Sequence, residues 1–255
     1  MHSEHIYANI YIINHKDLLG NIVTPEISII IPVFNEPETI QSTLEHLALL
    51  SAGKVVEIVI VDADPQSSTL KTIDFKSLPN LVLKTDTSAK GRGIQMNKGA
   101  ELASGPILLF LHADTCLPAG GMDAILSAMQ DPDFMGGAFD LGIRSSKWGY
   151  RIIEKVATAR SRITRLPYGD QAIFLRRDYF QMIGGFTPIP IMEDVDLMRR
   201  IKHRGDTIKI IDKQVQTNSR RWEKEGLVLC TLRNWMLMVL YLMGVSPHKL
   251  VKFYS

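Results

Sequence analysis

The first half of the chain alternates between short apolar runs and segments whose apolar residues recur at helical spacing. The runs are rich in Ile, Val and Leu, which predicts buried β-strands at 27–34, 55–61, 81–83 and 107–111. Between the first two runs, Ile40, Leu44 and Leu47 predict a helix with one face on the sheet. A second helix is predicted from Lys90 to about Ser104.

The second half continues this alternation with different spacing. Residues 134–143 and 172–175 read as strands, and a helix is predicted to start at Glu193. Between the two strands, a helix over 148–163 places Ile152, Val156 and Ile163 on one side. The whole pattern predicts an α/β fold in which a mostly parallel central sheet carries helices on both faces.

The C-terminal tail is a nearly continuous apolar segment from Trp235 to Val245. It is shorter than the roughly 20 apolar residues that span a bilayer. It can be a helix packed on the domain, or a helix on a membrane with Trp235, Tyr241, Lys249 and Lys252 at the interface. We therefore divide the chain into an N-terminal extension, an α/β domain and a C-terminal helical segment at 1–26, 27–222 and 223–255.

Polar residues follow the predicted strand at 107–111. His112 and Asp114 are two residues apart, so in an extended segment they point to the same side. Such a pair can hold a divalent cation beside a phosphate, or a ribose and a metal separately. The alternative is an ordinary strand end whose Asp caps the segment before Pro118.

Three strand ends bring chemistry to one edge of the predicted sheet, because ligands bind at the carboxyl ends of parallel strands. They are residues 32–36, Asp62 with Asp64, and His112 with Asp114. Arg92 adds positive charge at a helix start, where backbone N–H groups already favour an anion. These groups suit a nucleoside diphosphate. The glycine motifs of dinucleotide-binding folds and of P-loop NTPases are missing, so those classes are disfavoured.

An acidic cluster, Glu193-Asp194-Val195-Asp196, opens the last predicted helix of the domain. Carboxylates in a first turn complement the helix dipole, which is one interpretation. The other is a general base that deprotonates an attacking hydroxyl opposite a diphosphate. Both can hold, with Glu193 capping and Asp194 reacting.

The composition narrows the class of protein. The chain has 45% hydrophobic residues and a net charge of +2, which indicates a globular domain without the basic footprint of a nucleic-acid-binding protein. Cys116 and Cys230 are too few for a disulfide framework. The first five residues lack the basic-then-apolar pattern of a signal peptide, so we expect a cytoplasmic location, with a peripheral position on the inner membrane face as the alternative.

In this order and at these separations, six motifs resemble family 2 glycosyltransferases with the GT-A fold. The resemblance covers roughly Ile27 to Trp222. The motifs are I-S-I-I-I-P-V-F-N-E, the Val61-Asp62 strand end, the helix start from Gly91 to Asn97, His112-Ala113-Asp114, Gly184-Gly185-Phe186 and Glu193-Asp194.

The resemblance implies transfer of a sugar from a nucleotide donor, typically a UDP-sugar, with inversion at the anomeric carbon and a divalent cation, Mn²⁺ or Mg²⁺. By the same resemblance, Asp194 is the catalytic base, Asp114 binds the metal, and Arg92 lies near the uracil or the diphosphate. Base and ribose are expected to contact Pro32, Asn35, Glu36 and Asp62. His112 stands where the family's D-x-D motif has its first Asp, a position that often contacts ribose, so the identity and affinity of the metal are left open.

A narrower resemblance is to small bacterial members labelled arsenosugar-associated or diaponeurosporenoate glycosyltransferases. It rests on L-H-A-D-T, G-D-Q, M-E-D-V-D-L and S-R-R-W-E-K-E-G. It implies a hydroxyl or carboxyl acceptor that is small or lipid-like. Contacts to acceptor or diphosphate are expected from Gly137, Asp170, Gln171, Arg221 and Trp222.

Two other function classes compete with an inverting glycosyltransferase. A nucleotidyltransferase on a related sheet would carry a glycine-rich, Arg-containing loop after its first strand, where this chain has Asn35-Glu36-Pro37. A catalytically silent nucleotide-sugar-binding protein is favoured by His112 and disfavoured by Asp114 and Asp194.

Overall fold

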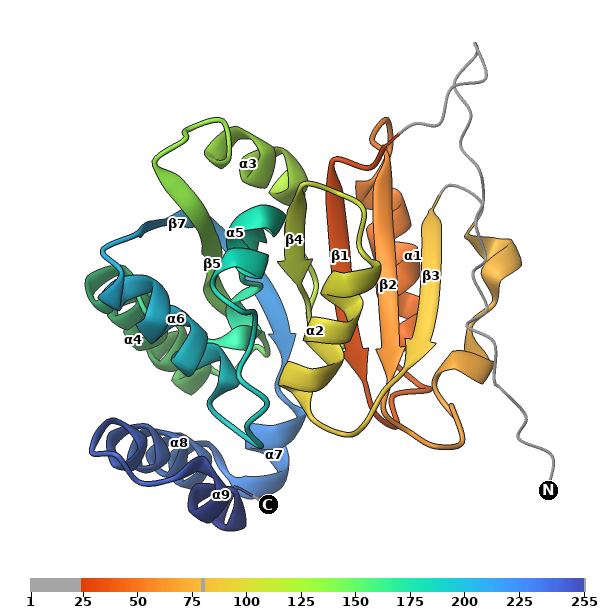
Figure 1. The fold of residues 1–255 in the computed structure, drawn as a ribbon. Coiled ribbons are helices and arrows are strands. Elements are labelled where there is room, and N and C mark those ends of the chain that lie inside the picture. Colours follow the sequence, from red (N-terminus) through yellow and green to blue (C-terminus); the bar gives the residue numbers. More distant parts are fainter. Residues whose placement is uncertain (1–23, 79–80, 255) are drawn as a thin grey trace, which may run out of the picture.

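The computed structural model describes residues 24–78 and 81–254. The predicted extension at 1–26 therefore lies outside the described residues except for its last three. Within the described ranges, seven strands form one sheet in the order β3-β2-β1-β4-β6-β5-β7 (Figure 1). The strands are β1 Ile27–Val33, β2 Val56–Asp62, β3 Val82–Thr87, β4 Ile107–Phe110, β5 Phe134–Arg144, β6 Phe174–Arg176 and β7 Thr207–Asn218.

Helices cover both faces of this sheet, as the alternating pattern predicts. One layer packs α1 and α3 against inward residues such as Ile29 and Ile31 of β1. The opposite layer packs α2, α5 and α6 against Ile30 and its neighbours. The nine α-helices of the described ranges are α1 Ile40–Leu50, α2 Arg92–Leu102, α3 Gly121–Ala128, α4 Trp148–Thr164, α5 Arg177–Met182, α6 Glu193–His203, α7 Arg220–Glu225, α8 Leu227–Leu242 and α9 Pro247–Leu250.

One strand reverses the direction of the sheet. β1, β2, β3 and β4 pair in parallel, but β6 is antiparallel to both β4 and β5. The carboxyl ends of the other strands consequently meet at the edge where β6 begins. Figure 1 shows this edge facing α7, α8 and α9.

The edge strand β7 was not among the predicted elements. It pairs in parallel with β5, but Ile211 faces Phe139 whereas Gln214 faces Asp140, so Asp212 and Lys213 form a bulge. The buried residues of β7 are spaced by three, four and two positions, at Ile208, Ile211, Val215 and Thr217, so the segment lacks the regular two-residue period on which a strand prediction rests.

The apolar side predicted for the helix at 148–163 does not face the core. Ile152, Val156 and Ile163 are exposed, and the helix buries Tyr150 and Glu154 instead. The carboxylate of Glu154 accepts the backbone N–H of Ile143 at 2.6 Å. A polar bond to β5 thus anchors α4.

The C-terminal segment packs on the domain through one side of α8. Leu237, Tyr241 and Leu250 are buried against Ile191 and Val195 at the start of α6. This tail therefore closes over the carboxyl edge of the sheet.

Candidate active site

A pocket lies at the carboxyl edge, between the strand ends and the C-terminal helices. The residues that line it include Arg92, His112, Asp114, Asp170, Asp194, Arg221 and Trp222, which come from five separate segments of the chain. Seven predicted site residues therefore share one cavity.

Asp194 is held by the backbone of two neighbouring segments. Its Oδ2 accepts the N–H of Gly169 at 2.6 Å, and its Oδ1 accepts the N–H of Val195 at 2.8 Å. A side chain at Gly169 would fit only tightly, because a Cβ there would lie 3.2 Å from Nε2 of His112 and 3.3 Å from Oδ2 of Asp194. The loop before β6 thus separates His112 from Asp194 with a single glycine.

Glu193 pairs with Arg92 and joins the starts of α6 and α2. Its Oε1 lies 2.7 Å from Nε of Arg92, and the Glu193 residue is 2% exposed. Burial disfavours the charge of Arg92, but the neighbouring carboxylate of Glu193 holds the pKa of Arg92 above its ordinary value. Glu193 therefore neutralises Arg92, whereas its neighbour Asp194 faces the pocket.

Asp170 is the pocket carboxylate with the most altered acidity. Burial, followed by the nearby charge of Asp194, raises its pKa to about 6. Its Oδ1 is buried and has no hydrogen-bond partner among the described residues. Asp170 can therefore carry a proton under mildly acidic conditions.

The surroundings of His112 favour the neutral form of its imidazole. Burial and the positive charge of Arg92 lower its pKa. A neutral ring nitrogen can accept a hydrogen bond or bind a metal.

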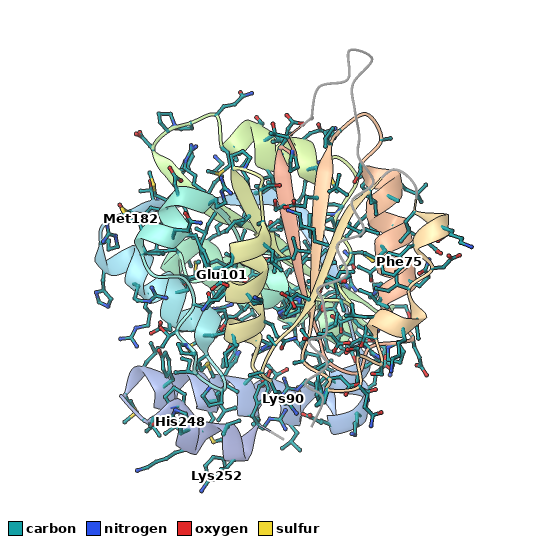
Figure 2. The ribbon with its side chains drawn as sticks, turned by 45° about the vertical axis from the view of Figure 1, so that its right-hand side comes forward. Phe75, Lys90, Glu101, Met182, His248 and Lys252 are labelled. Carbon is teal, nitrogen blue, oxygen red and sulfur yellow. The ribbon has the colours of Figure 1, made fainter. Side chains whose placement is uncertain are left out.

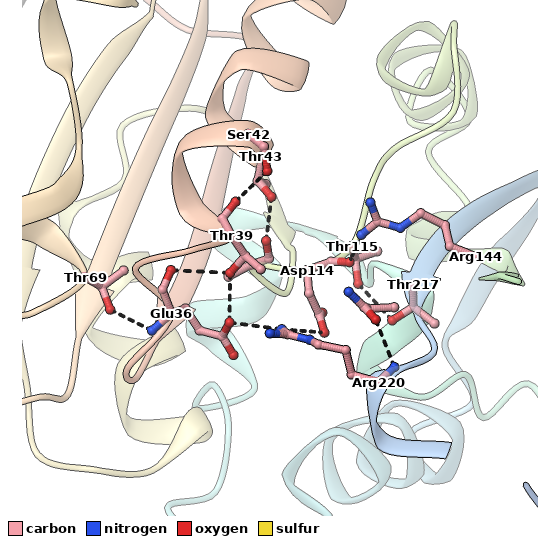
Figure 3. Close-up of polar contacts among 12 residues, drawn as sticks. Glu36, Thr39, Ser42, Thr43, Thr69, Asp114, Thr115, Arg144, Thr217 and Arg220 are labelled. Carbon is pink, nitrogen blue, oxygen red and sulfur yellow. Dashed lines mark hydrogen bonds and ion pairs between the residues drawn. The ribbon is translucent and has the colours of Figure 1, made fainter. Parts of the chain in front are cut away.

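Arg220 lies between two carboxylates at the mouth of the site (Figure 3). One Nη is 3.1 Å from Oε2 of Glu36 and 3.7 Å from Oδ2 of Asp114. Glu36 is further fixed by hydroxyls, since its backbone N–H donates to Thr69 at 3.0 Å and its carboxylate accepts from Thr39 at 2.8 Å. The predicted metal ligand therefore already has a cationic neighbour.

Asp114 fits a metal that is shared with a diphosphate. The described residues contain no group of three or more His, Cys, Asp or Glu side chains that could hold an ion by themselves. Mg²⁺ is usually held by one or two carboxylates together with substrate phosphates. Asp114 beside the neutral His112 suits that arrangement.

The predicted nucleotide residues lie at the ends of β1 and β2. Asp62 is fully buried and accepts the N–H of Asp64 at 2.8 Å, and burial raises its pKa. Asn35 has a left-handed backbone with φ of 57°, and Pro32 is buried in β1. None of these residues lines the pocket, and Glu36 is linked to the pocket residue Asp114 through Arg220.

Two residues expected to contact a ligand are used by the protein itself. Gly137 lies near the start of β5, far along the strand from the carboxyl edge, and a Cβ there would lie 2.5 Å from the Phe174 ring. Gln171 is fully buried and donates to the carbonyl of Phe139 at 2.8 Å and to Ser161 at 3.1 Å. The close approach at Gly137 is that of the Lys209 carbonyl oxygen, at 2.2 Å from the same Cβ position, and of the Phe174 ring. Gln171 shapes the loop and does not line the pocket.

The tail adds residues that the sequence reasoning did not predict. Asn234, Met238 and Tyr254 line the pocket from the tail, and Tyr168, in the loop before β6, lines it as well. Asn234 is the one amide within the apolar run of α8, and its Oδ1 is buried without a partner among the described residues. A polar residue in an apolar helix was the available signal.

Arg221 and Trp222 reach the pocket from α7. The guanidinium of Arg221 lies 3.9 Å from the ring centroid of Tyr254 and donates to the Tyr254 carbonyl at 3.2 Å. Trp222 meets Tyr150 edge-on with ring centroids 6.2 Å apart.

Within the part of the chain that the structure describes, no helix has the length and apolar character needed to cross a bilayer.

Solved structures with this fold include nucleotide-sugar complexes. A mannosyltransferase of Pyrobaculum calidifontis in complex with GDP-Man and Mn²⁺ matches with a TM-score of 0.63 and 20% identity, over 83% of this chain and 60% of that one. S. aureus TarS 1-349 in complex with UDP-GlcNAc matches with a TM-score of 0.59 and 17% identity, over 76% and 58%. At this identity the likeness shows the fold alone, which is the GT-A fold.

Relatives by sequence carry glycosyltransferase names. A "PGL/p-HBAD biosynthesis glycosyltransferase" of Mycobacterium bovis is 30% identical over 173 residues, which are 64% of this chain and 63% of the relative. An "Uncharacterized glycosyltransferase" of Haemophilus influenzae is 24% identical over 69% of this chain and 61% of its own length. The chain thus spans less than two thirds of these relatives. The family model described as glycosyl transferase family 2 matches residues 28–189. The chain belongs to that family.

Proposed function

We propose that this chain is an inverting, metal-dependent glycosyltransferase that moves a sugar from a nucleoside diphosphate donor, a UDP-sugar, to an acceptor oxygen. The observation that carries the proposal is the fixed carboxylate of Asp194 in the pocket that also holds Arg92, His112 and Asp114. Family membership and the names of the relatives support the same reaction class.

The reaction balances with Asp194 as the base. An acceptor hydroxyl attacks the anomeric carbon, the new C–O bond forms as the bond to the diphosphate breaks, and the leaving group keeps the electron pair. Asp194 takes the hydroxyl proton, since its two backbone hydrogen bonds fix the carboxylate in place. An acceptor carboxylate is already ionised and would attack without a base.

A divalent cation would be held by Asp114 together with the donor's diphosphate oxygens. It would supply positive charge against the leaving diphosphate. Two guanidinium groups of the protein, Arg92 and Arg221, line the same pocket and can donate hydrogen bonds to phosphate oxygens, although Glu193 offsets the charge of Arg92. Asp62 and Glu36, with Pro32 and Asn35, would surround base and ribose at the neighbouring strand ends.

The acceptor would be small or lipid-like, as in the bacterial members labelled arsenosugar-associated or diaponeurosporenoate glycosyltransferases. The apolar groups around Asp194, such as Tyr168, Met192 and Met238, support an acceptor with apolar surface. A cytoplasmic enzyme in peripheral contact with the inner membrane face would meet such an acceptor.

The first experiment follows release of nucleoside diphosphate from a panel of UDP- and GDP-sugars, with and without Mn²⁺. We expect slow donor hydrolysis that requires metal and is lost in Asp114→Ala. Asp194→Asn should lower transfer about 100-fold or more while UDP binding survives. Asp123→Asn, on the surface of α3, serves as the matched control.

Normal turnover of Asp194→Asn would refute the assignment of the base. Tight donor binding without turnover, with or without metal and across an acceptor panel that includes lipids and carotenoid acids, would favour the silent nucleotide-sugar-binding alternative.

A further inference from the structure

Helix α8 has two different sides. One side is buried through Cys230, Leu237 and Tyr241. The other side, which we call the outer face, consists of Leu229, Leu232, Trp235, Met236, Val239 and Leu242. At 100° per residue these six positions fall within one arc of the helix.

The outer face is exposed to solvent among the described residues. Its side chains are between 47% and 68% exposed, and the arc contains no charged residue. Single apolar residues scattered over the surface are normal for a monomer. A contiguous exposed patch of six apolar residues instead indicates a binding surface.

The flank of the outer face is basic. Residues 226–255 contain the exposed Lys249 and Lys252, and their third basic residue, Arg233, is paired with Glu225. Lys249 and Lys252 are exposed, as is Phe253 beside them. Figure 2 shows His248 and Lys252 at the end of the molecule where α8 and α9 lie.

From these features we infer that the outer face of α8 docks on an anionic lipid bilayer, with the helix axis in the plane of the membrane. The helix has 16 residues, too few to span a bilayer, but an apolar arc with a tryptophan and nearby lysines suits the interface. A bilayer can also cover a long helix face without the groove of matching shape that a protein partner would need.

A second copy of the chain fits this surface less well. A two-fold pairing through α8 with the two helices parallel would bring the exposed Lys249 and Lys252 of one copy towards those of the other. Like charges placed together oppose association, whereas anionic head groups attract both lysines.

Docking would place the pocket at the lipid surface. Asn234 and Met238, on the remaining side of α8, line the pocket that contains Asp194. The same helix is thus both a wall of the pocket and a lipid contact. This step rests on the proposed function and names its substrate class: an acceptor carried in the membrane, with its reactive oxygen near the head groups.

Flotation of the full chain with vesicles tests the docking directly. We expect binding to vesicles of phosphatidylglycerol and phosphatidylcholine in equal parts, and weak binding to phosphatidylcholine alone. The double variant Leu232→Glu with Val239→Glu should lose binding about tenfold or more, since each substitution removes an apolar side chain that the bilayer would bury. Lys249→Gln with Lys252→Gln should weaken binding to the anionic vesicles about fivefold per lysine.

Leu49→Glu is the matched control, because Leu49 is 78% exposed on α1, away from α8. It should float like the unaltered chain. Donor hydrolysis in solution, measured on the same samples, should be equal in all variants, so loss of docking and absence of transferase activity can be told apart.

Two outcomes would overturn the inference. One is that the unaltered chain does not float, or that the Leu232→Glu, Val239→Glu variant floats equally well. The other is that sedimentation without lipid shows a dimer that the same variant dissociates, which would identify the outer face as a self-association surface.

Discussion

At the scale of single residues, the site depends on which carboxylates are neutralised by the protein. Glu193 is paired with Arg92, whereas the adjacent Asp194 is held only by backbone N–H groups and faces the pocket. The two adjacent acids at the start of α6 therefore have different partners, a possibility that the sequence left open. The structure favours Glu193 as the partner of Arg92 over a direct chemical role.

Asp170 should make stability depend on pH. Its folded pKa of about 6 exceeds the ordinary value of 3.8, so the folded state prefers the protonated form. Stability from this group is complete below about pH 4, falls as the pH rises to about 6, and is constant above. Asp170→Asn, which resembles the protonated form, should therefore be about 2 kcal/mol more stable than the unaltered chain at pH 8 and equal at pH 4.

Urea unfolding at the two pH values measures this difference. A gain of the same size at both values would mean that Asp170 is ordinarily acidic and that the substitution acts through packing.

Arg220 should weaken binding of a free metal ion at Asp114. Its guanidinium lies 3.7 Å from the Asp114 carboxylate, where like-charge repulsion of an incoming cation is on the order of 1 kcal/mol in a solvated site. Arg220→Gln should therefore tighten Mn²⁺ binding in the absence of nucleotide about three- to tenfold. A titration with Mn²⁺, followed by the electron paramagnetic resonance signal of the free ion, measures this affinity.

Arg204→Gln, at the end of α6, controls for the loss of one positive charge. Unchanged or weaker Mn²⁺ binding in Arg220→Gln would contradict the prediction. It would mean that Arg220 does not oppose the metal, or that the ion does not bind at Asp114.

At the scale of elements, the strands that carry chemistry could be predicted because they are short, apolar and end in polar residues. β1, β2 and β4 lie where the apolar runs predict them. β7 was missed because its buried residues are irregularly spaced, and the exposed side of α4 was misjudged because α4 is anchored by Glu154 and Tyr150. Local pattern cannot show which of two sides meets a neighbour.

The position of α2 depends on a glycine. A Cβ on Gly99 would lie 2.4 Å from Cγ2 of Ile30, a stiff branched side chain in β1. Gly99→Ala should therefore cost about 1–3 kcal/mol in the free energy of unfolding, despite the better helix propensity of alanine.

Gly149→Ala in α4 is the matched comparison, since a Cβ there meets only Leu227 at 3.5 Å. It should be neutral or stabilising by up to about 1 kcal/mol. Equal effects of the two substitutions in denaturant melts would show that α2 does not pack this closely on β1.

At the scale of the whole molecule, the site is assembled by contacts between distant segments, which sequence reasoning could name but not arrange. Motif order indicated Asp114, Asp194 and Arg92, and all three line one pocket. It could not show that Gly169 lies between His112 and Asp194, or that Gly137 and Gln171 turn to other parts of the protein. It also gave no sign that the tail forms one wall.

The reversed strand β6 has a practical consequence for experiments on this chain. Because β6 starts at the carboxyl edge, the loop before it belongs to the site, and a label there would interfere with chemistry. The turns at the opposite edge, before β2 and before β7, lie beside the exposed residues Ala52 and His203. A fluorophore or an affinity tag placed there would report on the intact protein with its pocket and its outer face untouched.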